Sequence, residues 1–578
     1  MPNDDTGMRK GLTSYGDAAF SLFLRKAFIK AMGYSDDALN RPVVGIANTF
    51  SGYNACHRNA PELVEAIKRG VMLAGGLPVE FPTISVHESF AYPTSMFLRN
   101  LMAMDTEEMI RAQPMDSVVM IGGCDKTVPA QLMGAASAGV PAISVVTGPM
   151  MAGSHRGERL GACTDCRRYW GMFRAGEIDE AETEEVSGKL APTAGTCMVM
   201  GTASTMACMT EALGMMLPGG AAIPAVAADR LRHAEAAGVR AVEMAKSGGP
   251  TPDRIMTPEA FSNAFTVLLA IGGSTNGLIH MTAVAGRLGI KVDLEAFDRI
   301  GRETPVLVDL KPSGQHYMQH LQDAGGLVAV LRELRPLLHL DCLTVSGRTL
   351  GEEIDAAPPP WPQDVVRPLD DPIYPQGGIA VLRGNLAPDG AIVKQSAASE
   401  NLMTHTGRAV VFEDQEDLVA RIDDPDLDVH ADDVLVMRNA GPKGAPGMPE
   451  SGYIPIPRKL AAAGVKDMLR MSDARMSGTA FGSIVLHITP ESAVGGPLAL
   501  VENGDRIRLD VPNRTLDLLV DDGELARRRA AWTPPAPHAG SERGYLKLYL
   551  DHASQAGDGV DFDFLTKAPD GRTTPVIS

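Results

Sequence analysis

The sequence predicts a mixed α/β protein, with an N-terminal domain built on a mainly parallel sheet flanked by helices and a C-terminal β-barrel-like domain. Three observations support this. Strand-like apolar runs alternate with helical patterns in the first part of the chain, a proline-rich stretch follows at residues 356–378, and short alternating runs separated by turns come after it. We therefore expect domains at residues 1–370 and 371–578.

In the N-terminal domain, apolar runs predict strands at residues 42–50, 79–86, 118–121 and 141–148. Helical patterns begin near Pro61, residue 95 and Pro129, with proline at the first turn of two of them. Strands that alternate with helices form parallel sheets, whose carboxyl ends share one edge and bind ligands there. Cys56, Glu88 and the run Cys124-Asp125-Lys126 should therefore emerge along that edge.

Residues 191–220 are rich in small residues and methionine. They predict a loop that holds Cys197, followed by a packed helix in which the methionines and Cys208 fill the core. Residues 264–281 combine an apolar run, two glycines and a polar turn, as residues 118–126 do. This pattern suggests another strand and a further wall of a pocket, and a helix or strand that ends at an ordinary glycine turn is an equal alternative.

In the C-terminal domain, alternating runs predict strands at residues 391–395, 408–413, 433–438, 483–489, 506–511 and 516–521. Two glycine-rich segments interrupt them, at residues 441–452 and 472–482. Neither contains the Gly-Lys-Ser/Thr of a phosphate-binding loop. Long loops of this kind in a compact barrel are more often functional than decorative.

The composition excludes several classes of function. The chain has 53 basic and 71 acidic residues and a net charge of −18, which argues against a nucleic-acid surface. We see no secretory signal and no apolar run long enough to span a membrane, so we expect a cytoplasmic protein with no membrane partner. Seven cysteines in 578 residues are too sparse for a disulfide framework and fit reduced thiols.

Two groups of residues could hold metals. Cys56, Cys124 and Cys197 each lie in a loop beside a predicted helix start, and such thiolates suit zinc or an iron–sulfur cluster. Their spacings of 68 and 73 residues exclude compact zinc-finger and ferredoxin motifs, so only folding could bring them together. Three thiolates would leave one metal position open to a substrate oxygen. The carboxylates of Glu88, Asp125 and Glu450 suit Mg²⁺ instead.

A further pair, Cys163 and Cys166 in the motif CTDC, looks like a redox or metal motif, although it lacks a partner pair and a thioredoxin-like context. An ordinary structural role remains the alternative for this pair.

Several long motifs, in order through both domains, resemble the dihydroxy-acid dehydratase/6-phosphogluconate dehydratase family. They are GGCDKTVPAQLMGAAS, AGTCMVMGTASTMACMTEALGMMLP, GGSTN, GPKGAPGMPE and SDARMSGTAFG. Branched-chain dihydroxy-acid enzymes usually carry GCDKN and a TDGRFSGG-like motif, whereas GCDKT and SDARMSGTAFG are similar to the sugar-acid (aldonate) dehydratases. Two segments depart from the family: YNACHRN stands where TPCN is usual, and CTDC stands where no cysteine pair is expected.

The resemblance implies a [2Fe–2S] cluster held by Cys56, Cys124 and Cys197, and Ser477 as the catalytic base. It also implies Mg²⁺ held by Glu88, Asp125, Glu450 and a carboxylated Lys126. The implied enzyme is a hydro-lyase that converts a small anionic 2,3-dihydroxy acid, most simply a sugar acid, to a 2-keto-3-deoxy acid, and that forms a homodimer or homotetramer. The alternatives are a branched-chain dihydroxy-acid dehydratase and, in another class, a non-catalytic iron–sulfur sensor.

Overall fold

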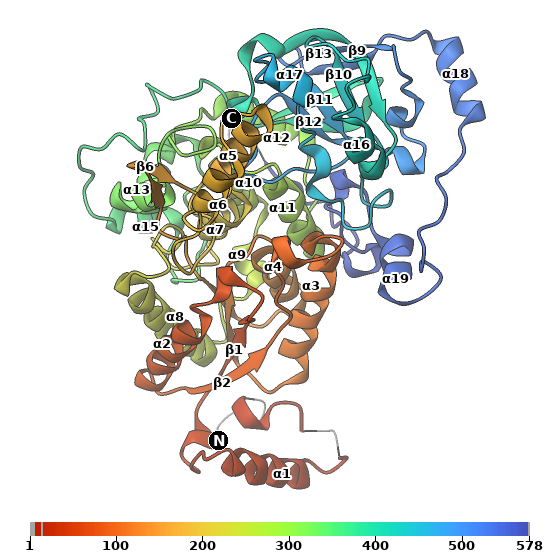
Figure 1. Ribbon diagram of the computed structural model, residues 1–578. Coiled ribbons are helices and arrows are strands. Elements are labelled where there is room, and N and C mark those ends of the chain that lie inside the picture. Colours follow the sequence, from red (N-terminus) through yellow and green to blue (C-terminus); the bar gives the residue numbers. More distant parts are fainter. Residues whose placement is uncertain (1–5, 13–14, 576–578) are drawn as a thin grey trace.

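A parallel sheet forms the centre of the N-terminal domain in the computed structural model, which describes residues 6–12 and 15–575 (Figure 1). Its strands are β1 (Val43–Asn48), β2 (Leu77–Pro82), β3 (Ser117–Gly122) and β4 (Ala142–Val146), and their order is β2-β1-β3-β4. All neighbouring pairs run parallel. The predicted mixed α/β class and its parallel sheet are therefore confirmed.

Helices cover both faces of this sheet. Helix α2 (Ala60–Leu73) packs on α8 (Ala228–Ser247), and α3 (Ser95–Ala112) packs on α4 (Thr127–Ala138). Figure 1 shows the two pairs on opposite sides of the strands. The first pair is close because glycines lie at the crossing: a Cβ at Gly70 would come within 2.0 Å of the Glu235 carbonyl oxygen, and one at Gly238 within 2.4 Å of the Ile67 carbonyl oxygen.

The helix expected after Cys197 is α7 (Thr202–Ala212), and Cys208 and its methionines lie in the core as predicted. Of the alternatives for residues 264–281, the strand is wrong and the helix that ends at a glycine turn is correct. Residues Pro258–Ala270 form helix α10, capped by Thr257, and α11 (Asn276–Arg287) follows the glycine turn. Every residue of α10 from Ala260 to Ala270 is buried, and a continuously apolar run has neither the period of a strand nor that of an amphipathic helix.

The C-terminal domain contains a closed barrel of mixed parallel and antiparallel pairs, in the order β10-β11-β12-β8-β7-β14-β13-β9. The strands are β7 (Ala380–Gly384), β8 (Ala387–Val393), β9 (Thr404–Phe412), β10 (Val434–Met437), β11 (Arg470–Ser472), β12 (Ile484–Thr489), β13 (Arg506–Asp510) and β14 (Thr515–Leu518). The predicted barrel-like domain is confirmed, and each run named for it contains a strand. Strands β7 and β11 were not predicted.

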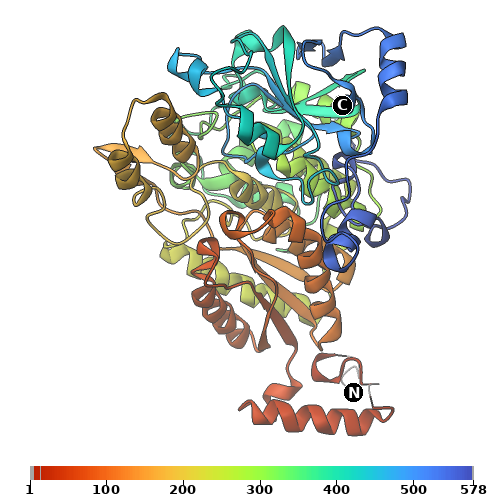
Figure 2. The same cartoon turned by 45° about the vertical axis from the view of Figure 1, so that its right-hand side comes forward.

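Between α15 (Leu350–Ala356) and β7 the chain runs without a helix or strand of its own, in the stretch where the sequence predicts the domain boundary. The boundary at residue 370 itself stays a prediction. After the barrel, the chain returns to the N-terminal domain through α19 (Gly544–His552), and the Tyr545 hydroxyl donates to the Phe97 carbonyl oxygen over 2.7 Å. Figure 2 shows this return beside the N-terminal helices.

The remaining helices and strands surround these two domains. They are α1 (Ala18–Ala31), α5 (Thr164–Ala175), α6 (Glu180–Ser187), α9 (Pro252–Ile255), α12 (Leu294–Glu303), α13 (Met318–Asp323), α14 (Gly326–Glu333), α16 (Gln415–Arg421), α17 (Arg458–Ala462), α18 (Asp522–Ala531), β5 (Gly153–His155) and β6 (Glu158–Leu160). Within the described ranges, we find no helix with both the length and the apolar character that a membrane crossing requires.

Candidate active site

Polar side chains gather at the carboxyl ends of the parallel strands, as the sequence predicts. Cys56 lies in a 3-10 turn (Ala55–His57) after β1, and Glu88 begins another (Glu88–Phe90) after β2. Cys124, Asp125 and Lys126 occupy the turn between β3 and α4. The strands fix where the chain leaves the sheet, and the short turns keep these side chains close to that edge.

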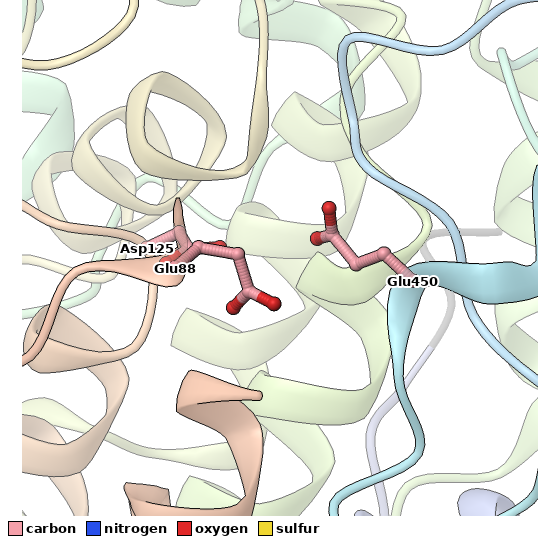
Figure 3. A group of neighbouring side chains, drawn as sticks. All are labelled: Glu88, Asp125 and Glu450. Atoms are coloured by element: carbon pink, nitrogen blue, oxygen red, sulfur yellow. The ribbon is translucent and has the colours of Figure 1, made fainter. Parts of the chain in front are cut away.

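Three carboxylates converge at this edge. The ligand atoms of Glu88, Asp125 and Glu450 all lie within 4.8 Å of one another. Figure 3 shows Glu88 and Asp125 approaching from the sheet side and Glu450 facing them from the loop of the C-terminal domain. Their side chains are 27%, 15% and 18% exposed, so the group is largely withdrawn from solvent.

Two fully buried cations balance these carboxylates. Lys126 pairs with Asp125, and its Nζ lies 3.6 Å from Glu88 Oε2. Arg475 Nη1 lies 2.7 Å from Glu450 Oε1, and its Nη2 lies 3.6 Å from Glu88 Oε1. Sequence reasoning included Arg475 in a functional segment but gave it no role. The signal available in the sequence was a basic residue within a glycine-rich loop.

The pKa values of Glu88 and Glu450 shift in opposite directions. Burial alone would raise the pKa of Glu88, but the charges of Lys126 and Arg475 outweigh it and hold that pKa well below the usual range. Burial raises the pKa of Glu450, because here the attraction of Arg475 is smaller than the desolvation. Glu88 therefore loses its proton at a lower pH than Glu450 does.

Hydrogen bonds orient Glu88 further. The Thr94 hydroxyl donates to Glu88 Oε1 over 2.6 Å, and the Ser95 hydroxyl donates to its other oxygen. Arg475 Nη2 donates to Thr94 Oγ1 over 2.7 Å. A residue of the C-terminal domain therefore helps to position the threonine that binds Glu88. The donor set consists of hard oxygen atoms in a mostly buried position, which fits Mg²⁺.

Thiols lie next to the carboxylates. Cys124 Sγ donates to Asp125 Oδ1 over 3.5 Å. An interaction with the Cys124 thiol, followed by burial, raises the pKa of Cys56 well above its usual value, and Cys197 is close enough to add to the shift. The structure thus brings the three predicted cysteines together. Soft sulfur donors in a partly buried loop cluster fit an iron–sulfur group.

His57 positions Cys124, a role that sequence reasoning missed. It is fully buried, and burial lowers its pKa to about 4, so the ring is neutral at pH 7. Its Nδ1 donates to the Thr49 carbonyl oxygen over 2.9 Å, which leaves Nε2 to accept from the Cys124 backbone N–H over 2.8 Å. The signal available in the sequence was a histidine directly after Cys56.

Ser477 lies in the loop between β11 and β12 and remains partly exposed. Its hydroxyl is 2.9 Å from Thr479 Oγ1, and the Thr479 carbonyl oxygen accepts from Thr164 Oγ1 over 3.1 Å. A Cβ at Gly201 would lie 2.9 Å from Thr479 Cγ2 and 4.0 Å from Cys197 Cβ. The Ser477 loop therefore packs against the segment that carries Cys197.

The Ser477 loop depends on a glycine. A Cβ at Gly478 would come within 2.6 Å of Ser274 Cβ and 2.7 Å of the Thr202 backbone nitrogen. We expect Gly478→Ala to cost about 1–3 kcal/mol of stability by overpacking and to lower kcat by displacing Ser477. Thermal unfolding and initial rates check this. Gly171→Ala is the control, because its new Cβ meets open space on α5; equal effects of both substitutions would contradict the argument.

Lys394, directly after β8, is a third residue whose role the sequence did not reveal. It is 1% exposed, and its Nζ donates to the Gly478 carbonyl oxygen over 3.4 Å. Burial lowers its pKa to about 7. Between about pH 7 and 10.5, the unfolded chain therefore binds a proton that the folded chain does not, so this residue makes stability rise with pH across that window.

We accordingly expect Lys394→Met to flatten the pH dependence of stability, by up to about 1.4 kcal/mol per pH unit between pH 7.5 and 9. Denaturant midpoints of the wild type and the variant, measured at several pH values, check this. Lys466→Met removes an exposed lysine from the same domain and should leave the slope unchanged. Parallel profiles for Lys394→Met and the wild type would contradict the prediction.

A sizeable cavity lies elsewhere in the structure. It has a volume of about 570 Å³, and Arg332, Arg348, Glu353 and Trp361 are among its lining residues. It contains none of the residues discussed above. We place the chemistry at the carboxylate and thiol groups instead, because carboxylates, buried cations and thiols converge there.

An α/β domain that shares a buried carboxylate group with the loops of a barrel, beside a cluster of thiols, defines a two-domain protein with a candidate active site at this group. The chain belongs to the dihydroxy-acid/6-phosphogluconate dehydratase family. The N-terminal description of that family matches residues 41–353, and the C-terminal description matches residues 364–560. The chain is accordingly a dehydratase.

The relatives indicate the branch of this family. The chain is 49% identical to an L-arabinonate dehydratase of Rhizobium leguminosarum bv. trifolii (strain WSM2304), over 95% of both chains. It is 46% identical to a 6-deoxy-6-sulfo-D-gluconate dehydratase of Pseudomonas putida, over 92% of this chain and 91% of the relative. A dihydroxy-acid dehydratase of Syntrophobacter fumaroxidans is 40% identical, over 93% and 96%. The predicted similarity to the sugar-acid branch is confirmed.

Proposed function

We propose that this chain dehydrates an aldonic acid to a 2-keto-3-deoxy acid. We propose that it uses Mg²⁺ and a [2Fe–2S] cluster held by Cys56, Cys124 and Cys197. One observation carries the proposal. A group of hard oxygen donors and a group of soft sulfur donors are joined through adjacent residues, Cys124 and Asp125, whose side chains are 3.5 Å apart. Two different metals at neighbouring positions suit a reaction that develops charge at two adjacent carbons.

The proposed Mg²⁺ ligands are Glu88, Asp125, Glu450 and Lys126, with the lysine carboxylated. In that modification the neutral amine of Lys126 bonds to the carbon of CO₂ and releases a proton, so a cation becomes an anionic oxygen ligand. The environment of Lys126 supports a special role, because its side chain is fully buried against two of the carboxylates. When bound, the two metal groups would supply Lewis acids for the C2 and C3 oxygens.

Ser477 is the proposed base. Its alkoxide takes the proton from C2, and the hydrogen bond with Thr479 stabilises the charged oxygen. The C3–O bond breaks as the C2–C3 double bond forms. The departing hydroxide takes the proton from Ser477 Oγ and leaves as water, which restores the alkoxide. The enol then tautomerises to the 2-keto acid. Arg475 holds Glu450 and Glu88 in place, and its positive charge would also attract an anionic substrate.

A panel of acids tests this proposal. The full chain, purified without oxygen, is incubated with C5 and C6 aldonates and with 2,3-dihydroxyisovalerate, and 2-keto acid formation is followed. We expect turnover of at least one aldonate and little of dihydroxyisovalerate. Preference for dihydroxyisovalerate would instead favour the branched-chain enzyme. A chain that binds iron and sulfide but dehydrates none of these acids would favour the sensor.

The proposal also covers the cellular location and the assembly of the enzyme. We propose that it acts in the cytoplasm on a small anionic substrate, and that it assembles as a homodimer or homotetramer. Light scattering of the purified chain tests the assembly.

A further inference from the structure

The cysteine pair of the CTDC motif lies beside the proposed cluster ligands. Cys163 is the residue before helix α5, and Cys166 follows in its first turn. Cys163 Sγ is 3.8 Å from Cys197 Sγ, although 34 residues separate them in the sequence. The proposed mechanism uses neither Cys163 nor Cys166, and all of these cysteines are free thiols in the structure.

The distance between the two sulfur atoms is informative. A disulfide requires about 2.05 Å between sulfur atoms. Two thiolates on one tetrahedral metal, each bound at about 2.3 Å, stand about 3.8 Å apart. The 3.8 Å between Cys163 and Cys197 equals this second spacing. This spacing excludes a disulfide and allows both sulfur atoms to bind one metal ion.

The thiols also fall into two groups. Cys56 interacts with Cys124, whereas Cys163 contacts Cys197 and also interacts with Cys166. A [2Fe–2S] cluster bound by four thiolates takes two on each iron, so this arrangement provides one pair for each.

The surroundings of the second pair are apolar. Cys163, Cys166 and Cys197 pack against a buried cluster made of Met150, Ala162, Met198, Val199 and Tyr317. Such a shell keeps water away from a metal and favours sulfur over oxygen ligands.

We propose that Cys163 is a fourth thiolate ligand of the resting cluster, on the same iron as Cys197. This inference rests on the proposed function. It implies that Cys163 leaves that iron when substrate binds, so the position needed for catalysis is covered until then. This ligand exchange needs no oxidant or reductant. The Cys163 thiolate leaves the iron with its electron pair, and the substrate oxygen donates an electron pair of its own to the same iron.

The test compares the anaerobically purified wild type with Cys163→Ala, and uses Cys166→Ala as the matched control from the same motif. Iron and sulfide content, the visible spectrum and the electron paramagnetic resonance signal of the reduced cluster are measured with and without aldonate. We expect about two irons per chain in all three proteins. The substrate-free spectrum of Cys163→Ala should be altered, whereas that of Cys166→Ala should match the wild type.

Saturating aldonate should change the wild-type spectrum and leave that of Cys163→Ala nearly unchanged. If Cys163→Ala and the wild type contain equal iron and give identical spectra without substrate, the inference is wrong while the proposed function stands. A disulfide at Cys163, detected by mass spectrometry in the active anaerobic enzyme, would also overturn it. A wild type without iron and sulfide would overturn both. Cys163→Ser, which keeps the side-chain volume, repeats the comparison should the alanine variant fold poorly.

Discussion

Replacing Ser477 with alanine is expected to lower kcat by about 10³-fold, because a positioned base contributes about 10²–10⁴-fold. Iron content and visible absorbance should stay at wild-type values, since the Ser477 hydroxyl contacts Thr479 and not a cysteine. Initial rates of 2-keto acid formation, with a spectrum of the same sample, measure both quantities.

The control for this experiment is Ser483→Ala, six residues further along. That hydroxyl is buried and donates to Asp467 Oδ2 over 2.8 Å, so its loss removes a structural hydrogen bond and no proposed catalytic group. It should reduce kcat far less than Ser477→Ala. If Ser477→Ala retains activity within tenfold of the wild type, another group must take the C2 proton.

Replacing Asp125 with asparagine is expected to weaken Mg²⁺ binding while the cluster remains. Asparagine keeps the size of the side chain and one oxygen but removes a negative charge from a group whose ligand atoms lie within 4.8 Å of one another. At the Mg²⁺ concentration that saturates the wild type, we expect the kcat of Asp125→Asn to be about 10²–10³-fold lower. Calorimetric titration with Mg²⁺ and iron analysis of the same preparation separate the two effects.

Two further variants sharpen this experiment. Glu450→Gln removes a charge from the same group but from the opposite domain, so it should also weaken Mg²⁺ binding and spare the iron. Cys197→Ser should lower the iron content and leave Mg²⁺ binding unchanged. Equal loss of Mg²⁺ and iron in Asp125→Asn would show that Asp125 does not serve the carboxylate group alone.

The sequence predicted the fold well where periodicity was strong. The β1 and β3 segments are apolar runs that end in polar turns, and the barrel strands alternate between turn signals, so both could be located. The α10 segment could not, because it is buried on all sides and its composition fits a strand equally well. The short strand β11 lacks a full alternating pattern, and only its neighbours define it.

The site was predictable only in part, and mostly through the family resemblance. Strand ends indicated where Cys56, Glu88 and Asp125 would meet. Nothing local indicated that Arg475 would reach across to Thr94, 381 residues away in the chain. Lys394 looked like one polar position in an alternating strand, and only tertiary packing isolates it from other charges. The contact of Arg475 depends on how the two domains dock, and the burial of Lys394 depends on how the barrel packs, and periodicity encodes neither.

The charges around the carboxylate group have one more consequence. Three acidic and two basic side chains leave this group with a formal charge of −1. Carboxylation of Lys126 would change the total to −3, and one divalent cation would restore −1. Uptake of CO₂ and uptake of Mg²⁺ should therefore be thermodynamically linked, each raising the affinity for the other by the same factor. Bicarbonate in the buffer, as a source of CO₂, would then raise the affinity of this group for Mg²⁺. Mg²⁺ would in turn favour carboxylation of Lys126.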